Sequence, residues 1–225
     1  KIEPEKQNTK IDFLYCNRDI GIPVVCVTNI IKKGKQLFYF NSKGEEILIK
    51  RIYNRVIFDE LELRTDLQLN FSFSDDLEVE WAGHPNWFFR ISKFILPMLK
   101  GKYFIETTLL SDLKEIPTDL ENYVLKPLFS FSGSGVIFHV TQADIEAVTE
   151  KELYILQKKV NYIPIVQSPD GKVKAEVRVL CVWKKEDKSP TLLCNLVRLS
   201  RGEMIGVKFN KDKDWVGGTL GLFER

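Results

Sequence analysis

The chain has 225 residues, of which 44% are hydrophobic and 28% are charged, with 13 Gly and 9 Pro. This composition is that of a globular protein with one large domain or two small ones, and it excludes a disordered or collagen-like chain. The 33 Lys and Arg against 31 Asp and Glu leave a net charge of +2, which is too small to hold nucleic acid or an anionic membrane through an overall field.

The apolar residues form no run of the roughly 18 that a membrane-spanning helix needs, and residues 1–10 lack the apolar stretch of a signal peptide. We therefore expect a cytoplasmic protein that has neither nucleic acid nor a membrane as a partner. The four cysteines show no CxxC spacing, and Cys26, Cys181 and Cys194 lie in apolar runs. We expect buried free thiols, with a bridge between Cys181 and Cys194 as the alternative.

Residues 1–82 predict a small N-terminal α/β segment. Within it, residues 20–28 form a short β-branched run, which predicts a buried strand. Two apolar runs flank a turn in which Gly44 supplies the positive φ that a hairpin needs. Residues 77–81 alternate apolar and acidic side chains, which indicates a half-exposed strand. The strands expected in this segment are 20–28, 36–40, 46–49, 52–56 and 77–81.

Residues 85–96 predict a helix, because apolar side chains recur there at helical spacing. Pro85 suits the first turn and Gly101 suits a C-terminal cap, while Pro97 is expected to end or kink the helix. The apolar residues of this pattern are Phe88, Ile91, Phe94, Ile95 and Met98.

The remainder of the chain predicts mainly β-structure. A small-residue loop, 129–135, separates the first two strands, and a helix is expected to begin at Thr141 or Gln142 and to run through Ala147. The last two strands are long and apolar, which favours an antiparallel pair. The strands expected in this part are 123–127, 136–140, 153–155, 162–166, 175–183 and 192–199.

Lys126 lies near the end of a predicted strand and is followed by Ser132-Gly-Ser-Gly135. A lysine and a small, flexible loop in this order can place an ammonium group and backbone N–H groups around a phosphate. The alternative is a hairpin turn with an exposed lysine. A Walker A loop is excluded, since it needs Gly-Lys-Ser/Thr at the start of a helix. A protein kinase is also excluded, because its lysine follows the glycine loop.

These residues resemble the ATP-grasp superfamily, most closely its glutathione synthetase-like branch. In that family a strand that ends in Val-(Leu or Met)-Lys-Pro precedes a Gly/Ser-rich loop and a second strand, as in residues 123–140 here. The similarity covers residues 50–218 and rests on the order and spacing of several short motifs. It implies an α+β fold of ATP-grasp type in residues 83–225, with two β-rich lobes around a nucleotide cleft.

The resemblance also implies the site residues. Lys93, in Arg90-Ile-Ser-Lys93, corresponds to the family's earlier nucleotide lysine, and Arg51-Ile-Tyr-Asn-Arg55 is similar to a short strand ahead of the grasp domain. Arg178 and Arg198 correspond to arginines that face the triphosphate or the acyl-phosphate, and they are the predicted catalytic residues. The predicted nucleotide-binding residues are Lys93, Lys126, Ser132, Gly133, Ser134, Gly135 and the hinge-strand residues Gln157, Lys158 and Val160. The resemblance implies that the backbone of this hinge strand forms hydrogen bonds to adenine.

One departure from the family concerns the metal. The acidic residue and the Glu-x-Asn pair that hold Mg²⁺ in family members do not follow the Trp215-Val-Gly-Gly218 loop. Glu176 and Asn210 are the predicted substitute ligands, with Asn195 as a third candidate. Two alternatives stay open, namely a sequence that continues further and a fold that has lost the metal and the reaction.

The function that the resemblance implies is an ATP-dependent ligase, which joins a small-molecule carboxylate to an amine or a thiol through an acyl-phosphate, with ATP and Mg²⁺. The alternative is a catalytically degenerate module that binds a nucleotide or a partner, and a third is a purely structural protein. Two histidines, His84 and His139, lack metal-ligand spacing, so we interpret them as helix-capping or strand residues.

Overall fold

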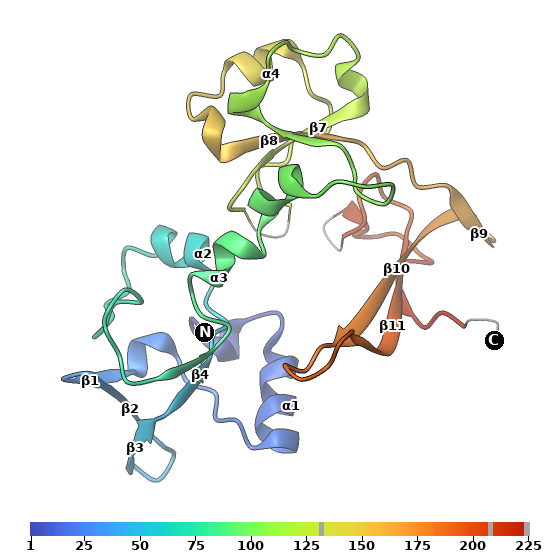
Figure 1. Ribbon diagram of the computed structural model, residues 1–225. Coiled ribbons are helices and arrows are strands. Elements are labelled where there is room, and N and C mark those ends of the chain that lie inside the picture. Colours follow the sequence, from blue (N-terminus) through green and yellow to red (C-terminus); the bar gives the residue numbers. More distant parts are fainter. Residues whose placement is uncertain (131–132, 207–208, 223–225) are drawn as a thin grey trace. The chain divides into compact units, whose positions relative to one another are not determined.

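The structure is a computed structural model that describes residues 1–130, 133–206 and 209–222. The chain divides into two compact units, Lys1–Lys158 and Lys159–Arg225. Several small sheets and a few short helices make up these units (Figure 1), so the expected α+β class is confirmed. The expected boundary between residues 82 and 83 lies inside the first unit. Among the described helices, none has the length and apolar character needed to cross a bilayer.

The first sheet of the first unit is antiparallel, in the order β1-β2-β3. Gly44 has a φ of 77° in the turn between β2 and β3, and Leu37 pairs with Ile49, so the predicted hairpin is confirmed. A separate parallel pair, β4-β5, is shorter than predicted, although Trp81 is half-buried and its acidic neighbours are exposed as expected. The strands are β1 (Ile31–Lys33), β2 (Gln36–Phe40), β3 (Glu46–Ile49), β4 (Arg51–Tyr53) and β5 (Glu80–Ala82).

The prediction of a strand at residues 20–28 is wrong. Helix α1 (Lys10–Ile20) ends there instead, because Gly21 adopts a φ of 65° and its N–H donates to the Asn17 carbonyl over 3.1 Å. The chain then runs irregularly to the short helix η2 (Val27–Asn29). Val27 is buried among Ile2, Leu37 and Phe71, so it enters the core without joining a sheet.

The helix expected at residues 85–96 is broken in two. Helix α3 (Trp87–Arg90) and the 3₁₀ helix η3 (Lys93–Met98) are separated at Ser92. The Ser92 hydroxyl donates to the Phe89 carbonyl and accepts from the Phe94 N–H, each over 3.2 Å. These local bonds compete with the helical ladder, which explains the break. A further helix, α2 (Phe58–Leu63), was not predicted.

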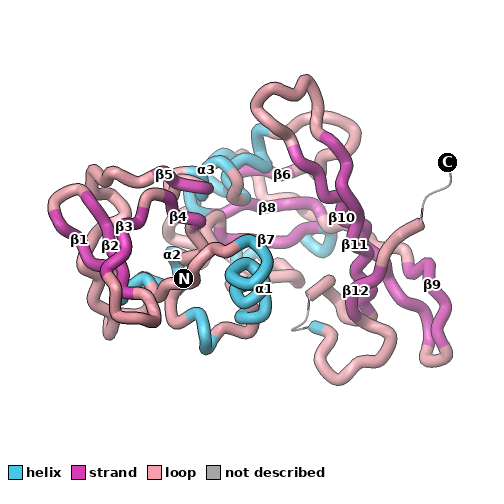
Figure 2. The backbone as a smooth tube through the Cα atoms, turned by 90° about the horizontal axis from the view of Figure 1, so that it is seen from below, coloured by secondary structure: helices cyan, strands magenta, loops and turns pink. Residues whose placement is uncertain are grey.

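The second sheet of the first unit has the order β6-β8-β7 and is antiparallel (Figure 2). The predicted strand at residues 136–140 is wrong, because only Ile137 pairs there, with Leu125. The predicted helix is confirmed, and a Thr141–Asp144 capping box begins it. The elements are β6 (Thr107–Leu109), β7 (Tyr123–Pro127), β8 (Tyr154–Lys158) and α4 (Gln142–Glu146).

The first unit contains two separate hydrophobic clusters of buried residues. The first lies under β2 and includes Leu37 and Phe71. The second lies between the β6-β8-β7 sheet and α4, where Leu125 and Leu156 pack with Ile145. The two three-stranded sheets of the first unit are therefore stabilised by separate cores.

The second unit is one antiparallel sheet in the order β12-β11-β10-β9. The two predicted long strands are confirmed, and Glu176 pairs directly with Arg198 across them. All four cysteines are free, but Cys181 and Cys194 are exposed, so the expected burial of these two is wrong. An apolar strand does not by itself specify what covers its face. The strands are β9 (Pro164–Ser168), β10 (Gly171–Val182), β11 (Thr191–Ser200) and β12 (Gly217–Thr219).

Candidate functional site

Two lysines from different elements meet at the loop that follows β7. Lys126 is the penultimate residue of β7, and its ammonium group donates to Gln157 Oε1 on β8 over 2.6 Å. Lys93 is the first residue of η3 and donates to the carbonyl and the hydroxyl of Ser130, over 2.9 and 3.1 Å. The structure thus brings together the two lysines predicted to contact a nucleotide.

Gln157 fixes the position of Lys126. The Gln157 side chain is buried, and its Nε2 donates to Thr107 Oγ1 over 2.8 Å. That hydroxyl uses its own proton to reach the Ile105 carbonyl over 2.9 Å, so it can only accept from Gln157. The amide oxygen must therefore face Lys126. Sequence reasoning assigned Gln157 to adenine through its backbone and missed this side-chain role, for which the only signal was a polar residue inside an apolar strand.

The two ammonium groups are unusually poor in negative neighbours. Burial lowers the pKa of Lys126, and the positive charge of Lys93 lowers it further. Burial likewise lowers the pKa of Lys93, against a smaller opposing effect of Asp59. Within the described residues, neither lysine forms an ion pair. Two adjacent, half-buried cations without a carboxylate partner favour an anion with more than one negative oxygen, such as a phosphate chain.

The loop after β7 folds back on the end of that strand. Gly133 and Gly135 have φ values of 76° and 67°, and a Cβ atom at Gly135 would lie 3.0 Å from Pro127 Cγ. Both the positive φ of Gly135 and the close approach of Pro127 therefore disfavour any side chain at this position. Gly133, Ser134 and Gly135 are all exposed. Ser132 lies outside the described residues. The loop residue that contacts Lys93 is Ser130, which sequence reasoning did not select.

A cavity of about 750 Å³ opens beside Lys93 and Ser130. Its wall also includes Arg55 and the rings of Trp87 and Phe88, so it combines cations, hydroxyls and aromatic faces. His84 lies on the same wall, where its Nδ1 accepts from the Asn86 N–H over 3.1 Å. The N-cap of α3 is Asn86 and has no side-chain cap, so His84 makes a local turn bond before the helix and its role as a helix cap stays a prediction.

The predicted hinge residues lie at the end of β8. The backbone of Gln157 is paired on both sides, with Thr107 of β6 and Val124 of β7. The Lys158 N–H donates to the Glu106 carbonyl over 3.0 Å, and its ammonium group pairs with the Glu106 carboxylate over 2.6 Å. Val160 follows the boundary between the two units and is exposed. The contact of these residues with adenine stays a prediction.

The second unit collects the predicted catalytic arginines around Glu176. Arg198 donates to Glu176 Oε1 through Nε and Nη2 over 2.9 and 2.6 Å, and Arg178 Nε donates to the same oxygen over 3.0 Å. Tyr162 donates to the other oxygen over 3.2 Å. Burial raises the pKa of Glu176, but the hydrogen bonds from Arg178 and Arg198 outweigh it and hold that pKa below its usual value. Glu176 therefore carries a negative charge shared by two guanidinium groups.

The two asparagines proposed as metal ligands have other partners. Asn210 Oδ1 accepts from the Ser200 hydroxyl and from the N–H groups of Arg201 and Gly202, over 2.8–3.0 Å. Asn195 exchanges two hydrogen bonds with the backbone of Gly221. Within the described ranges, no group of three His, Cys, Asp or Glu side chains could hold a metal ion. The geometry gives both asparagines a structural role.

No protein-family model matches the chain, and no curated protein matches its sequence.

Proposed function

We propose that this chain is an ATP-dependent ligase of ATP-grasp type, which joins a small-molecule carboxylate to an amine or a thiol through an acyl-phosphate. The observation that carries the proposal is that Lys93, which donates to Ser130, lies close enough to Lys126, which donates to Gln157, for its charge to lower the pKa of Lys126, with no ion pair to either lysine in the described part of the chain. The boundary between the two compact units gives further support, because it follows Lys158, one of the residues that the resemblance assigns to the hinge.

The proposed reaction has two steps. An oxygen of the substrate carboxylate attacks the γ-phosphorus of ATP, the bond from that phosphorus to the β-phosphate oxygen breaks, and ADP leaves. The amine or thiol then attacks the acyl carbon, loses a proton, and expels inorganic phosphate. In the first step negative charge moves onto the departing ADP, so fixed cations such as Lys93 and Lys126 stabilise the transition state.

Arg178 and Arg198 are the proposed catalytic residues of the second unit. Both guanidinium groups donate to one oxygen of Glu176. A phosphoryl group carries more charge and more acceptor oxygens than this carboxylate, so it competes with Glu176 for the arginines. The arginines would then neutralise the oxygens of the acyl-phosphate.

Mg²⁺ is the cofactor that the resemblance implies, but the described residues do not fit it. Glu176 already accepts hydrogen bonds from two guanidinium groups and a phenol, and the Asn210 oxygen accepts three hydrogen bonds. We therefore assign no residue to the metal and route no step through it.

A binding module without turnover is the second candidate. It is favoured by the ion pairs that already hold both predicted catalytic arginines to Glu176. The two candidates differ in the formation of an acyl-phosphate, which hydroxylamine traps as a hydroxamate. Release of ADP together with a hydroxamate, from a set of carboxylic acids, supports the ligase. Binding of ATP without either product supports the module.

Calorimetric titration of ATP tests the lysine pair directly. Lys126→Met removes one cation and is expected to weaken ATP binding by roughly 10- to 100-fold, the range for loss of one charged hydrogen bond. Lys151→Met is the matched control, because Lys151 is exposed and lies just before β8, a strand of the same sheet. Equal ATP affinity in the two variants, or no binding by the unmodified chain, would contradict the proposal.

A further inference from the structure

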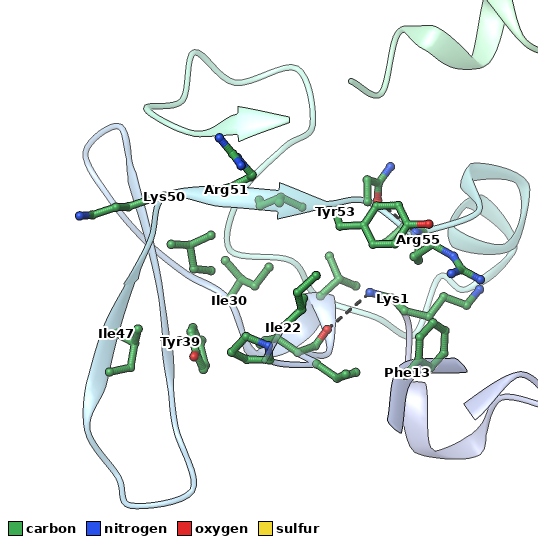
Figure 3. Close-up of a pocket in the computed structure, with 18 of the residues that line it drawn as sticks. Lys1, Phe13, Ile22, Ile30, Tyr39, Ile47, Lys50, Arg51, Tyr53 and Arg55 are labelled. Atoms are coloured by element: carbon green, nitrogen blue, oxygen red, sulfur yellow. Dashed lines mark hydrogen bonds between the residues drawn. The ribbon is translucent and has the colours of Figure 1, made fainter. Parts of the chain in front are cut away.

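A second cavity, of about 310 Å³, lies in the first unit between the β2–β3 hairpin, strand β4 and the irregular segment after α1. Figure 3 shows Ile22, Tyr39 and Ile47 around its apolar part, with Phe13 and Arg55 at one end. Most of its wall is aliphatic. Its aliphatic residues include Ile22, Val24, Val25, Ile47, Leu48 and Ile52, all of which are exposed or half-buried.

The size of this cavity indicates what it can hold. An apolar cavity of about 150 Å³ stays dry and binds benzene. The present cavity is twice as large, so it has room for a medium-length hydrocarbon chain or a fused aromatic ring.

The cations around this cavity differ in their partners. Arg51 pairs with Glu80, and Lys1 Nζ pairs with Glu60 over 2.5 Å. Figure 3 shows Lys50 extending away from the apolar side chains. Arg55 lies at one end of the cavity, and its guanidinium N–H groups donate no hydrogen bond to the described residues.

The contacts of Arg55 are weak ones. Its closest carboxylate oxygen belongs to Asp12 and lies 3.8 Å away, and its guanidinium carbon lies over the rings of Phe13 and Tyr53, at 5.3 and 5.7 Å from their centroids. In the described part of the chain it makes no hydrogen bond. A half-buried guanidinium held between rings, with its donors free, is well suited to a bidentate carboxylate.

Arg55 also connects this cavity to the cavity beside Lys93. It lies on the wall of both the 310 Å³ cavity and the 750 Å³ cavity, which includes Lys93 and Ser130. A carboxylate bound to Arg55 would therefore lie at the junction of the apolar cavity and the lysine-lined cavity, with its hydrocarbon part in the former.

We propose that the 310 Å³ cavity binds a monocarboxylic acid with an unbranched apolar chain, whose carboxylate is held by Arg55. Identification of this acid as the substrate rests on the proposed ligase function, whereas the binding site itself does not. Burial of one methylene group tightens binding by about fourfold. Affinity is therefore expected to rise from butyrate through hexanoate and octanoate to decanoate.

Calorimetric titration of these four acids, with 1-octanol as the uncharged probe, tests the proposal. We expect octanoate to bind at least tenfold more tightly than 1-octanol. Arg55→Gln should remove that advantage, leave 1-octanol binding unchanged, and be partly rescued by Arg55→Lys. Ile22→Trp should abolish binding of both probes, because the indole fills the cavity. Leu14→Trp is the control, since Leu14 is exposed on α1 and does not line the cavity.

Affinity that is independent of chain length, equal binding of octanoate and 1-octanol, or unchanged binding by Ile22→Trp would each overturn the proposal. Circular dichroism of every variant identifies any that fails to fold, and Arg55→Lys retains the charge if Arg55→Gln is lost. The two proposals fail separately. Octanoate binding by an unmodified chain that does not bind ATP supports the acid site alone, and ATP binding without acid binding overturns the acid site alone.

Discussion

Lys126 on β7 donates a hydrogen bond to the side-chain oxygen of Gln157 on β8, over 2.6 Å. Because Gln157 is buried and its other polar group is bonded to Thr107, the ammonium group is held in place before any ligand arrives. A cation that is fixed in advance loses little entropy on binding a phosphate. Under the proposed function, this bond therefore fixes Lys126 in advance for a phosphate.

Gln157→Leu is expected to destabilise the first unit by about 1–3 kcal/mol, because it leaves Lys126 and Thr107 without their partner in a buried setting. Urea unfolding measures the change. Gln36→Leu is the control, since Gln36 bonds only to the exposed Glu78, and it should change stability by about 0.5 kcal/mol or less. Similar losses of stability in the two variants would show that the hydrogen bonds of Gln157 to Lys126 and Thr107 contribute nothing particular to the fold.

The lowered pKa of Lys126 makes stability depend on alkaline pH. In the folded state this pKa lies below its ordinary value of 10.5, so between the two values the unfolded chain binds more protons. The free energy of unfolding therefore rises as pH rises through this range. Lys126→Met should show a smaller rise in the free energy of unfolding with pH. It removes the Lys126 ammonium group and, with it, the repulsion that acts on Lys93. Urea unfolding at several pH values from neutral to 10.5 measures this, and parallel curves would argue against it.

Asn210→Ala is expected to destabilise the second unit by about 1–3 kcal/mol, because the buried amide organises the chain between Ser200 and Gly206. Asn210→Asp should also be less stable, since it loses the N–H donors to the carbonyls of Met204 and Gly206. Thermal unfolding with and without Mg²⁺ separates this role from metal binding. Stabilisation by Mg²⁺ that persists in Asn210→Asp and is lost in Asn210→Ala would restore the metal-ligand prediction.

Thr141→Ala is expected to cost about 1 kcal/mol, the usual effect of removing an N-cap side chain. The Thr141 hydroxyl accepts from the Asp144 N–H over 3.2 Å at the start of α4. Thr149→Ala is the control, because Thr149 is exposed beyond the end of the same helix. Chemical denaturation of both variants gives the comparison, and equal stability would show that the capping box contributes nothing.

Gly135→Ala is expected to destabilise the first unit by about 1–2 kcal/mol from its positive φ alone. Its Cβ would also meet Pro127 Cγ at 3.0 Å. Gly34→Ala isolates the first effect, because Gly34 has a φ of 62° and nothing within 4 Å of the added atom. A larger loss of stability in Gly135→Ala than in Gly34→Ala, measured by urea unfolding, would show the cost of the contact with Pro127. Identical losses would indicate that the loop moves away freely.

Elements with a strong local signal could be predicted from the sequence. Gly44 supplied the turn of the β2–β3 hairpin, the capping box at Thr141 began α4, and the long apolar runs formed β10 and β11. The signal failed where a residue nearby had a competing partner. Ser92 broke the expected helix through its hydroxyl, and Gly21 ended a helix where a strand was expected. The ATP-grasp type, the ligase activity and the substrates stay predictions.

The sequence by itself determined the α+β class, the strand that presents Lys126 and the arginines that follow on later strands. Only the tertiary structure decided which groups meet, because a contact between distant residues depends on packing that local patterns do not encode. It brought Lys93 to Ser130, turned the Gln157 amide toward Lys126, and gave Glu176 to both Arg178 and Arg198. It also left Arg55 between two cavities, a position that comes from the packing of separate elements around it.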